Sequence, residues 1–260
     1  MCDPLLSRQK THMTNTSPAL IVFDMAGTTV RDNNEVLYCF SEACRQAGLT
    51  ADDKRLNALM GVSKLEVFQL LWREELGEDT DSGIIAVKSG ETFRLFCHIL
   101  EDYYQSHSVE PTEGALDVFG FLHDRGIKIA LNTGFYRKVT DIILNKLGWL
   151  AGLDAQYVGG IGSQINFSIT SDEVPMGRPE PYMIRKAMSV FGITDPGRVV
   201  KIGDTPVDLA EGRGAGVAYS IAVTNGTHTR EELEVLDNDG LLGALSELPG
   251  WLQERGWPER

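Results

Sequence analysis

The sequence contains few cysteines, and those few are not spaced for metal binding or redox chemistry. Its 260 residues include only four, Cys2, Cys39, Cys44 and Cys97. None of them belongs to a C-x-x-C pair, and none has companion histidines at the spacing of a zinc site. This pattern excludes a zinc knuckle and a dithiol redox motif. It favours reduced thiols, and we therefore expect a cytoplasmic protein.

Positive charge and long apolar runs are also scarce. The chain has 24 Lys and Arg against 37 Asp and Glu, a net charge of −13, and no basic block interrupts the acidic excess. We therefore expect no nucleic-acid partner and no anionic-membrane surface. No apolar segment is long enough to span a bilayer, and residues 1–17 are too polar for a signal peptide. We predict that residues 1–17 form a disordered leader.

The first predicted strand and the loop after it carry the clearest signal of a functional site. Leu20–Phe23 is an unbroken apolar run, typical of a strand buried on both faces, and it ends on Asp24. Open α/β sheets place their chemistry at the carboxyl ends of such strands. Gly27 suits a tight loop, and Thr28 and Thr29 offer hydroxyl groups or amides to an anion. Taken alone, the stretch is equally compatible with a strand that ends on a solvated aspartate.

The periodic segments that follow are all helical. Glu35–Gly48 has an apolar stripe that ends at a glycine, and a further helix is expected through Glu91–Tyr104. The segment from Ser63 to Glu66 has the form of a capping box. The helix that it begins is expected to bury Leu65, Phe68, Leu71 and Trp72. We predict that residues 35–111 form a helical cap domain inserted after the first strand.

Strand signals return after the helical block. Apolar runs alternate with predicted helices such as Val139–Leu147, and the runs are Ile127–Asn132, Phe167–Thr170, Arg198–Ile202 and Tyr219–Val223. The run at 219–223 is expected to be the last strand. This alternation predicts an α/β fold with a Rossmann-like, doubly wound parallel sheet. We expect the core domain to comprise residues 18–34 and 112–260.

Polar residues follow several of these strands and meet at one edge of a parallel sheet. Thr133 and Gly134 follow the second strand, and Asp204 and Asp208 follow the fourth, so that they join Asp24. Three converging carboxylates repel one another unless a cation neutralises them. An oxygen-only set of ligands selects a hard ion such as Mg²⁺. The sequence therefore predicts a magnesium site at this edge.

Arg178, between Gly177 and Pro179, adds a guanidinium group whose planar fork suits phosphoryl oxygens. Taken alone, Arg178 is better explained as a surface turn residue, and Thr133 as the residue that ends a strand. Their occurrence together with three aspartates, in this order along the chain, favours a site for a phosphoryl group.

These residues together resemble the haloacid dehalogenase-like hydrolase superfamily, and within it the phosphonoacetaldehyde hydrolase branch. The superfamily pattern is matched by Asp24, by Thr133 and by Gly203-Asp204-Thr205 with Asp208. The narrower branch is matched by three segments, Asp24-Met25-Ala26-Gly27-Thr28-Thr29-Val30, Met60-Gly61-Val62-Ser63-Lys64 and Gly177-Arg178-Pro179. The resemblance covers nearly all of the chain from residue 19 to residue 223.

The resemblance implies a mechanism and a set of site residues. Asp24 attacks phosphorus and forms an aspartyl-phosphate, which water then cleaves. The expected Mg²⁺ ligands are Asp24, the carbonyl group of Ala26 and Asp204, with support from Asp208. The phosphoryl group is expected to bind to Gly27, Thr28, Thr133, Gly134 and Arg178.

Ala26 bears on the choice of substrate. Typical phosphatases of the superfamily carry at this position a second aspartate that protonates the leaving alkoxide, whereas a methyl group transfers no proton. The phosphonatase-like alternative is a lysine that condenses with a carbonyl two bonds from phosphorus, and Lys64 stands at the matching position. This chemistry requires a neutral amine, so burial or nearby positive charge must lower the pKa of Lys64.

Three positions depart from the branch. Val67 replaces a histidine that follows the lysine by one turn, Phe135 replaces an aromatic hydroxyl although Tyr136 is adjacent, and Arg31 stands where an acid is usual. These changes leave the phosphoryl-transfer residues intact and affect the imine chemistry. They favour a related 2-oxoalkylphosphonate over phosphonoacetaldehyde itself.

The favoured function is therefore a Mg²⁺-dependent hydrolase that cleaves the C–P bond of a 2-oxoalkylphosphonate with a Schiff base on the cap lysine. A phosphate monoesterase on the same scaffold is the first alternative, and a non-catalytic phosphate-binding module is the second. The expected partner is a small phosphonate or phosphate, and a homodimer formed through the cap is a further expectation.

Overall fold

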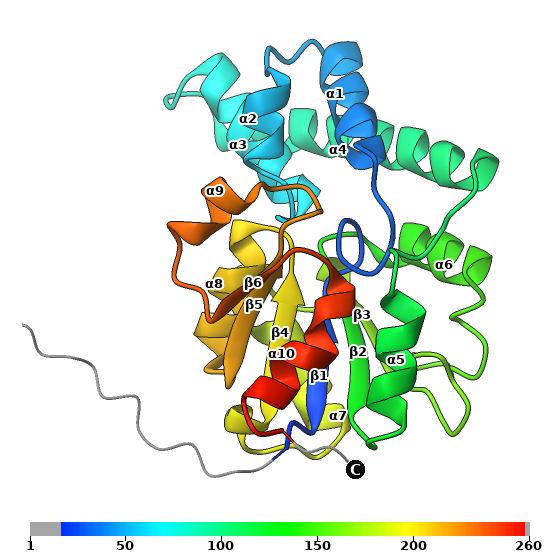
Figure 1. Cartoon of the computed structure of the whole chain (residues 1–260). Helices are drawn as coiled ribbons and strands as arrows, with labels where there is room; N and C mark the ends of the chain where they lie inside the picture. Colours follow the sequence, from blue (N-terminus) through cyan, green and yellow to red (C-terminus); the bar gives the residue numbers. More distant parts are fainter. Residues whose placement is uncertain (1–16, 258–260) are drawn as a thin grey trace, which may run out of the picture.

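Six parallel strands form one sheet in the order β3-β2-β1-β4-β5-β6 in this computed structural model, which describes residues 17–257 (Figure 1). The strands are β1 (Leu20–Phe23), β2 (Lys128–Thr133), β3 (Phe167–Thr170), β4 (Val199–Gly203), β5 (Tyr219–Val223) and β6 (Gly240–Leu242). The predicted Rossmann-like α/β fold is confirmed. Nearly all of the predicted leader, residues 1–16, lies outside the described residues.

The prediction that Tyr219–Val223 is the last strand is wrong, because β6 follows it and pairs with it in parallel. β6 has only three residues, and its first two are half-buried. Such a short edge strand leaves neither an apolar run nor an alternating pattern in the sequence. Its register is Ile221 beside Gly240 and Val223 beside Leu242.

β1 lies at the centre of the sheet, and all four of its side chains are buried because helices cover both faces. One face packs against α5 (Ala115–His123), α6 (Arg137–Lys146) and α10 (Leu248–Glu254). The other face packs against α7 (Tyr182–Val190) and α8 (Pro206–Ala215). The short helix α9 (Arg230–Glu234) lies beside β6. An apolar run at β1 is thus explained by burial on two sides.

Five helices lie between β1 and β2 in the chain, and the first four of them gather at one end of the sheet (Figure 1). They are α1 (Glu35–Ala47), α2 (Asp53–Asn57), α3 (Lys64–Leu76) and α4 (Ser82–Ser106). We call these helices and their loops the helical insertion. Three edge-to-face ring pairs join α1, α3 and α4 through Phe40, Phe68 and Phe96, with centroids 5.4–6.1 Å apart. Such pairs fix the helices relative to one another.

The start of α3 differs from the prediction in two respects. The helix begins at Lys64, but the Ser63 side chain makes no capping hydrogen bond, so the expected capping box is absent there. Leu65, which was predicted to be buried, is exposed, whereas Val67 is buried. The other three predicted residues, Phe68, Leu71 and Trp72, are buried, because α3 packs against α4 and Phe68 also contacts Phe40 of α1.

The insertion leaves and rejoins the sheet domain at one point. Val30 and Pro111 form an isolated antiparallel bridge, and the amide of Thr112 donates to the carbonyl of Thr29 at 3.0 Å. Next to them, an exposed ion pair of 2.9 Å joins Arg31 to Glu110. The two connecting segments are thus paired with each other.

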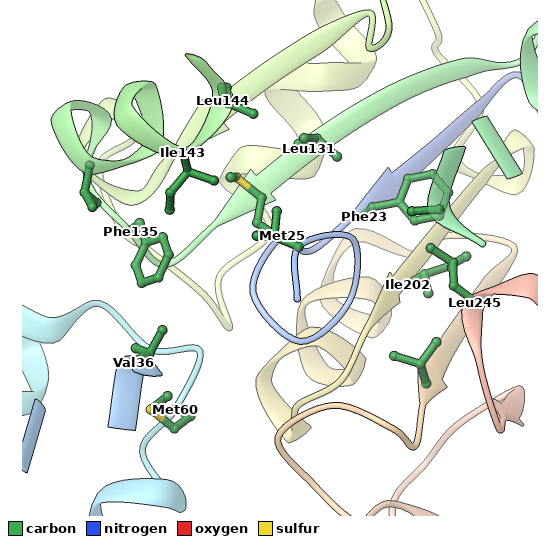
Figure 2. Packing of buried hydrophobic residues seen from close by; sticks show 14 of the residues in the cluster. Phe23, Met25, Val36, Met60, Leu131, Phe135, Ile143, Leu144, Ile202 and Leu245 are labelled. Carbon is green, nitrogen blue, oxygen red and sulfur yellow. The ribbon is translucent and has the colours of Figure 1, made fainter. Parts of the chain in front are cut away.

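The insertion also packs directly on the sheet domain. Val36 and Met60 of the insertion belong to the same buried cluster as Met25 and Phe135, which follow β1 and β2 (Figure 2). This apolar contact lies beside the carboxyl ends of the strands. In the described part of the chain, no helix combines the length and the apolar character needed to cross a membrane.

Candidate active site

Asp24 and Arg178 form the centre of a buried polar cluster at the carboxyl ends of the strands. The Asp24 amide donates to the carbonyl of Ile202 at 2.8 Å, which holds the residue at the end of β1. Arg178 Nη1 lies 2.8 Å from Asp24 Oδ1, and the two side chains are only 2% and 6% exposed. Arg178 reaches this position from the loop before α7, where its peptide bond to Pro179 is cis.

Asp204 follows β4 and is held by the loops on both sides of it. Thr28 Oγ1 donates to Asp204 Oδ1 at 3.1 Å, and the Thr227 amide donates to Oδ2 at 2.6 Å. A Cβ on Gly27, whose φ is +84°, would lie 2.2 Å from Oδ2, and one on Gly226 would lie 2.4 Å from it. Glycine is therefore required at both positions for Asp204 to approach the loop.

Thr28 was predicted to bind an anion, and the structure gives it other partners. Its hydroxyl donates to Asp204, and its amide donates to the carbonyl of Met25 at 3.1 Å. The hydroxyl of Thr29 donates to the backbone carbonyl of Asp24 at 2.8 Å. Both threonines thus hold the loop and its carboxylates in place, and their hydroxyls are engaged within the protein.

Asp208 is tied to cationic and hydroxyl groups through both of its oxygens. Oδ1 pairs with Arg178 Nη1 and lies 2.8 Å from Lys201 Nζ. Oδ2 accepts from the Thr205 hydroxyl at 2.5 Å and from the Thr205 amide at 3.2 Å, which forms a capping box at the start of α8. Asp208 thus holds Arg178, Lys201 and the start of α8 together at this end of the sheet.

A hard divalent cation fits the donor set of this cluster. Carboxylate oxygens of Asp24, Asp204 and Asp208 lie within 4.8 Å of one another, and all three residues are buried. Oxygen-only ligands of this kind are the ones that Mg²⁺ binds. Asp208 is paired with two cations, Arg178 and Lys201, whereas Asp204 accepts only from neutral donors and Asp24 pairs with Arg178 alone, which makes Asp24 and Asp204 the groups that could hold the ion.

The carboxylates differ in their tendency to ionise. Burial raises the pKa of Asp24, opposed by Arg178 and reinforced by its two acidic neighbours. Burial and the charge of Asp208 raise the pKa of Asp204 to about 6. Despite burial, Arg178 and Lys201 lower the pKa of Asp208. Asp24 and Asp204 therefore lack a cationic partner that would fully compensate their burial, whereas Asp208 has two.

Lys64 lines the same cavity as Asp24, although the two residues come from the insertion and the sheet. This cavity of about 30 Å³ is also lined by Ala26, Thr133, Gly134 and Arg178. Lys64 is 6% exposed, and its Nζ lies 5.1 Å from the centroid of the Phe40 ring. Burial and the charge of Arg178 lower the pKa of Lys64 to about 8. The predicted depression is confirmed, and the amine is partly neutral near pH 7.

The structure places Thr133 within β2 as its last residue, and Thr133 and the following Gly134 both line this cavity. Thr133 is buried, and its Oγ1 accepts a hydrogen bond of 3.1 Å from the amide of Phe135. A Cβ on Gly134 would lie 2.7 Å from the carbonyl oxygen of Gly61 and 3.3 Å from Arg178 Nη2. The absence of a side chain at Gly134 thus lets the insertion approach the sheet and leaves room beside the guanidinium group.

The positions that depart from the family pattern do not supply a proton-transfer group to this cavity. Val67 is buried within the insertion. The Tyr136 hydroxyl donates to the Cys97 carbonyl at 3.1 Å and to Glu101 at 2.9 Å, so it is directed to α4. Arg31 forms its exposed pair with Glu110. Ala26 contributes only its methyl group and backbone.

Sequence reasoning missed a buried polar network beneath the aspartates. Lys201 Nζ donates to Asn132 Oδ1 at 2.6 Å, and Asn132 Nδ2 donates to both carboxylate oxygens of Glu211 at 2.8 and 2.9 Å. All three side chains are completely buried. The signal was a lysine and an asparagine inside otherwise apolar strands, where isolated polar groups are costly and are retained only with partners.

A second cavity, of about 190 Å³, adjoins the first one. Three residues line both cavities, namely Lys64, Gly134 and Phe135. Aromatic side chains from the insertion and the sheet domain form much of its wall, among them Phe93, Phe96, Phe135 and Tyr136. The lysine thus separates a small, charged compartment from a larger and mostly apolar one.

Comparisons with known proteins agree with this arrangement. The model of the haloacid dehalogenase-like hydrolases matches residues 18–216. A phosphonoacetaldehyde hydrolase from Bacillus thuringiensis (strain Al Hakam) is 31% identical over 234 residues, which cover 84% of this chain and 81% of that protein. Among solved structures, a phosphonoacetaldehyde hydrolase-like protein from Oleispira antarctica has a TM-score of 0.70 at 19% identity, covering 93% of this chain and 95% of that one. A putative β-phosphoglucomutase from Bacteroides vulgatus has a TM-score of 0.72 at 17% identity, covering 94% and 91%.

Proposed function

Because the chain belongs to the haloacid dehalogenase-like hydrolases, we propose that it releases phosphate from a small 2-oxoalkylphosphonate by cleaving the C–P bond. One observation carries the proposal. A buried lysine with a pKa of about 8 and the aspartate that ends β1 line the same cavity. The first group suits condensation with a carbonyl, and the second suits attack on phosphorus.

Asp24 is the proposed nucleophile, and it forms an aspartyl-phosphate that water then cleaves. Arg178 and Thr133 would bind the phosphoryl oxygens, on which negative charge is spread in the transition state. Asp24, the Ala26 carbonyl and Asp204 would hold Mg²⁺, and Asp208 would keep Arg178 and Lys201 in place. When bound, the ion supplies charge that stabilises the phosphoryl group.

Lys64 is proposed to activate the leaving group. Its neutral amine condenses with the carbonyl two bonds from phosphorus, and the resulting protonated imine accepts the electron pair of the C–P bond as that bond breaks. This replaces the proton that an aspartate at position 26 would give to an alkoxide. The insertion, acting as a cap, would exclude water from the imine.

The second cavity supports a substrate larger than phosphonoacetaldehyde. A substituent on the carbonyl carbon would leave Lys64 on the side away from Asp24, where aromatic side chains surround about 190 Å³. We therefore propose a ketone with an apolar or aromatic substituent. Burial of such a group in an apolar pocket favours binding.

The experiment that tests this function is borohydride trapping during turnover. Protein is incubated with a series of 2-oxoalkylphosphonates of increasing apolar size, and phosphate release is measured. Borohydride should trap a substrate adduct on Lys64, found by mass spectrometry of peptides. Lys64→Arg should lose both the adduct and C–P cleavage, whereas Lys54→Arg, an exposed lysine of α2, should retain both. Turnover without an adduct, and an active Lys64→Arg, would contradict the proposal.

A phosphate monoesterase is the second candidate, and one observation favours it. Val67 is buried within the insertion, so the histidine expected one turn after the lysine has no substitute at that position. A panel of phosphate esters with alkyl leaving groups distinguishes the two activities, because such esters need a proton donor. Turnover of p-nitrophenyl phosphate does not distinguish the two activities, because its leaving group needs little protonation.

We also propose a cytoplasmic homodimer formed through the insertion. Apolar side chains exposed on α3 and α4 support this assembly, and they are Leu65, Leu70, Leu76, Ile84 and Val87. Light scattering of the full chain tests it. Val87→Asp should shift the mass to that of a monomer.

A further inference from the structure

Asp32 is an acidic residue of the catalytic cavity to which the proposed mechanism assigns no role. It lies between β1 and α1, it is half-buried, and it lines the cavity together with Asp24 and Lys64. Its charge is among those that act on Lys64. Four ionisable side chains line this cavity, namely Asp24, Asp32, Lys64 and Arg178, and the proposed mechanism uses all of them except Asp32.

The contacts of Asp32 hold its carboxyl group in a defined orientation. Its Oδ1 accepts hydrogen bonds from the amides of Glu35 at 2.8 Å and Val36 at 3.4 Å. The carboxyl group of Glu35 lies next to that of Asp32, and the two influence each other's pKa. Glu35 Oε1 accepts from the Asn33 side chain at 3.1 Å, and Oε2 accepts from the Asn33 amide. The hydrogen bonds from the first residues of α1 therefore fix the position of the Asp32 carboxyl group.

The pKa shifts of this pair favour a proton on Asp32. Burial and the neighbouring Glu35 carboxylate raise the pKa of Asp32 to about 8, whereas the pKa of Glu35 is lowered, although burial opposes it, by its interactions with Asp32 and Asn33. Glu35 lies closer to solvent at the start of α1, where a negative charge is favoured by the helix dipole. A neutral carboxylic acid thus faces the cavity, and the negative charge of the Glu35 carboxylate beside it favours retention of its proton.

We propose that Asp32 is the proton donor for condensation of the substrate carbonyl with Lys64. This inference rests on the proposed function, and it fills the gap that Ala26, Val67 and Tyr136 leave in the cavity. Amine addition to the carbonyl gives a carbinolamine. Asp32 then protonates its hydroxyl group, the C–O bond breaks, water leaves and the C=N bond forms.

The step balances in atoms and in charge. Neutral Lys64, neutral Asp32 and a ketone give a protonated imine, an Asp32 carboxylate and one water molecule. After C–P cleavage, the resulting enamine carbon takes up one proton, which balances the proton that hydrolysis of the aspartyl-phosphate releases. One water molecule then hydrolyses the imine, the amine leaves neutral and its proton returns to Asp32. The same residue therefore serves as acid in one direction and as base in the other.

The pH dependence of this step has two limbs. Imine formation rises as Lys64 loses its proton near pH 8 and falls as Asp32 loses its own. The groups that act electrostatically on Asp32 or respond to it are Glu35 and Cys39 on α1, Tyr103 and Tyr104 on α4 and Lys64 on α3. Apart from Lys64, none of these groups is cationic at neutral pH: Glu35 carries a negative charge, and Cys39, Tyr103 and Tyr104 are protonated and neutral. The charge of Glu35 therefore favours the protonated form of Asp32.

The test compares Asp32→Asn with Asp52→Asn in the full chain. Asparagine keeps the oxygen that accepts from Glu35 and Val36 but cannot donate an acidic proton. Asp52 also accepts from a helix amide, that of Arg55 at 2.7 Å, but it lies outside the cavity. The readout is the rate at which a borohydride-trapped adduct forms on Lys64 with a 2-oxoalkylphosphonate that the parent turns over.

Asp32→Asn should slow adduct formation by about 10²–10⁴-fold, remove the falling limb of its pH profile and leave the melting temperature within a few degrees. Asp32→Glu should restore part of the rate, and Asp52→Asn should match the parent. An adduct that forms as fast and with the same pH profile in Asp32→Asn overturns the role of Asp32 and leaves the proposed function intact. A parent protein that forms no adduct overturns both.

Discussion

Gly134 and Gly61 meet where the helical insertion contacts the sheet, and neither position has room for a side chain. A Cβ on Gly134 would lie 2.7 Å from the carbonyl oxygen of Gly61, and one on Gly61 would lie 2.7 Å from Thr205 Oγ1. Lys64 follows Gly61 by three residues, and Thr205 follows Asp204 directly. The distance between the lysine and the aspartates is thus set by backbone contact.

Gly134→Ala should therefore separate the insertion from the sheet. The added methyl group meets a backbone carbonyl, so one side must move by several tenths of an ångström. We expect C–P cleavage to fall at least tenfold while the protein remains folded, because small displacements of reacting groups are costly. Steady-state kinetics and melting temperature measure this. Gly120→Ala is the control, since nothing lies within 4 Å of its added Cβ, and it should keep full activity.

Asp24→Asn should remove phosphate release by more than 10³-fold. An amide cannot form an acyl-phosphate, but it has nearly the same shape, so the fold should persist. Stopped assays of phosphate release, together with circular dichroism, provide the measurement. The exposed Asp117→Asn on α5 is the matched control, with activity equal to that of the parent. Substantial turnover by Asp24→Asn would exclude Asp24 as the nucleophile.

Mg²⁺ should raise the melting temperature of the protein in a concentration-dependent manner. A ligand that binds the folded state stabilises it by RT ln(1 + [L]/Kd). Chelator-treated protein should lose activity and regain it with Mg²⁺, whereas zinc should substitute poorly in a site without His or Cys ligands. Asp204→Asn should abolish the thermal shift, and Asp117→Asn should preserve it. An undiminished shift in Asp204→Asn would place the ion elsewhere.

The stability of metal-free protein should fall as pH rises from about 4 to about 6. The folded-state pKa of Asp204 is raised to about 6 from 3.8, so in this interval the native state binds more protons than the unfolded state. Stability decreases with pH in such a window, by on the order of 2–3 kcal/mol for this group. Urea unfolding at several pH values measures it. The difference between parent and Asp204→Asn isolates the contribution of Asp204, and a difference that is constant with pH would contradict it.

Lys201→Met should destabilise the protein by about 3 kcal/mol or more. It removes the cation from beside the buried carboxylates of Asp208 and Glu211, and an uncompensated buried charge is costly. Unfolding by urea at neutral pH gives the value. Lys186→Met, at an exposed position of α7, is the control and should change stability by less than about 0.5 kcal/mol. Equal stability of both variants would show that the network has another source of compensation.

Much of the fold could be predicted because burial on two faces leaves strong runs in the sequence. Phe167–Thr170 and Tyr219–Val223 match β3 and β5 residue for residue. The convergence of Asp24, Asp204 and Asp208 follows from parallel topology, which brings strand ends together. β6 was missed because three residues with partial exposure carry no periodic signal.

The finer parts of the site could not be predicted, since they depend on tertiary contacts. Local spacing places Lys201 and Asn132 within apolar strands but does not show that they join Glu211. The engagement of Thr28 with Asp204 needs two loops 176 residues apart in sequence. Asp32 follows the recognisable motif closely, yet only the packing of the insertion brings it into a cavity with Lys64.

The pairing of the connecting segments at Arg31 and Glu110 has a consequence for the evolution of this chain. The two ends of the insertion are held together beside the sheet, so the insertion is a loop that closes on itself. Doubling the length of such a loop costs only about 0.6 kcal/mol of chain entropy. Insertions of other sizes could therefore be closed at this junction, provided that they also cover Met25 and Phe135, which Val36 and Met60 cover here. A replacement would inherit the aspartates and Arg178 and would lose Lys64, so under the proposed function the exchange would keep the proposed nucleophile and change the group that meets the leaving part of the substrate.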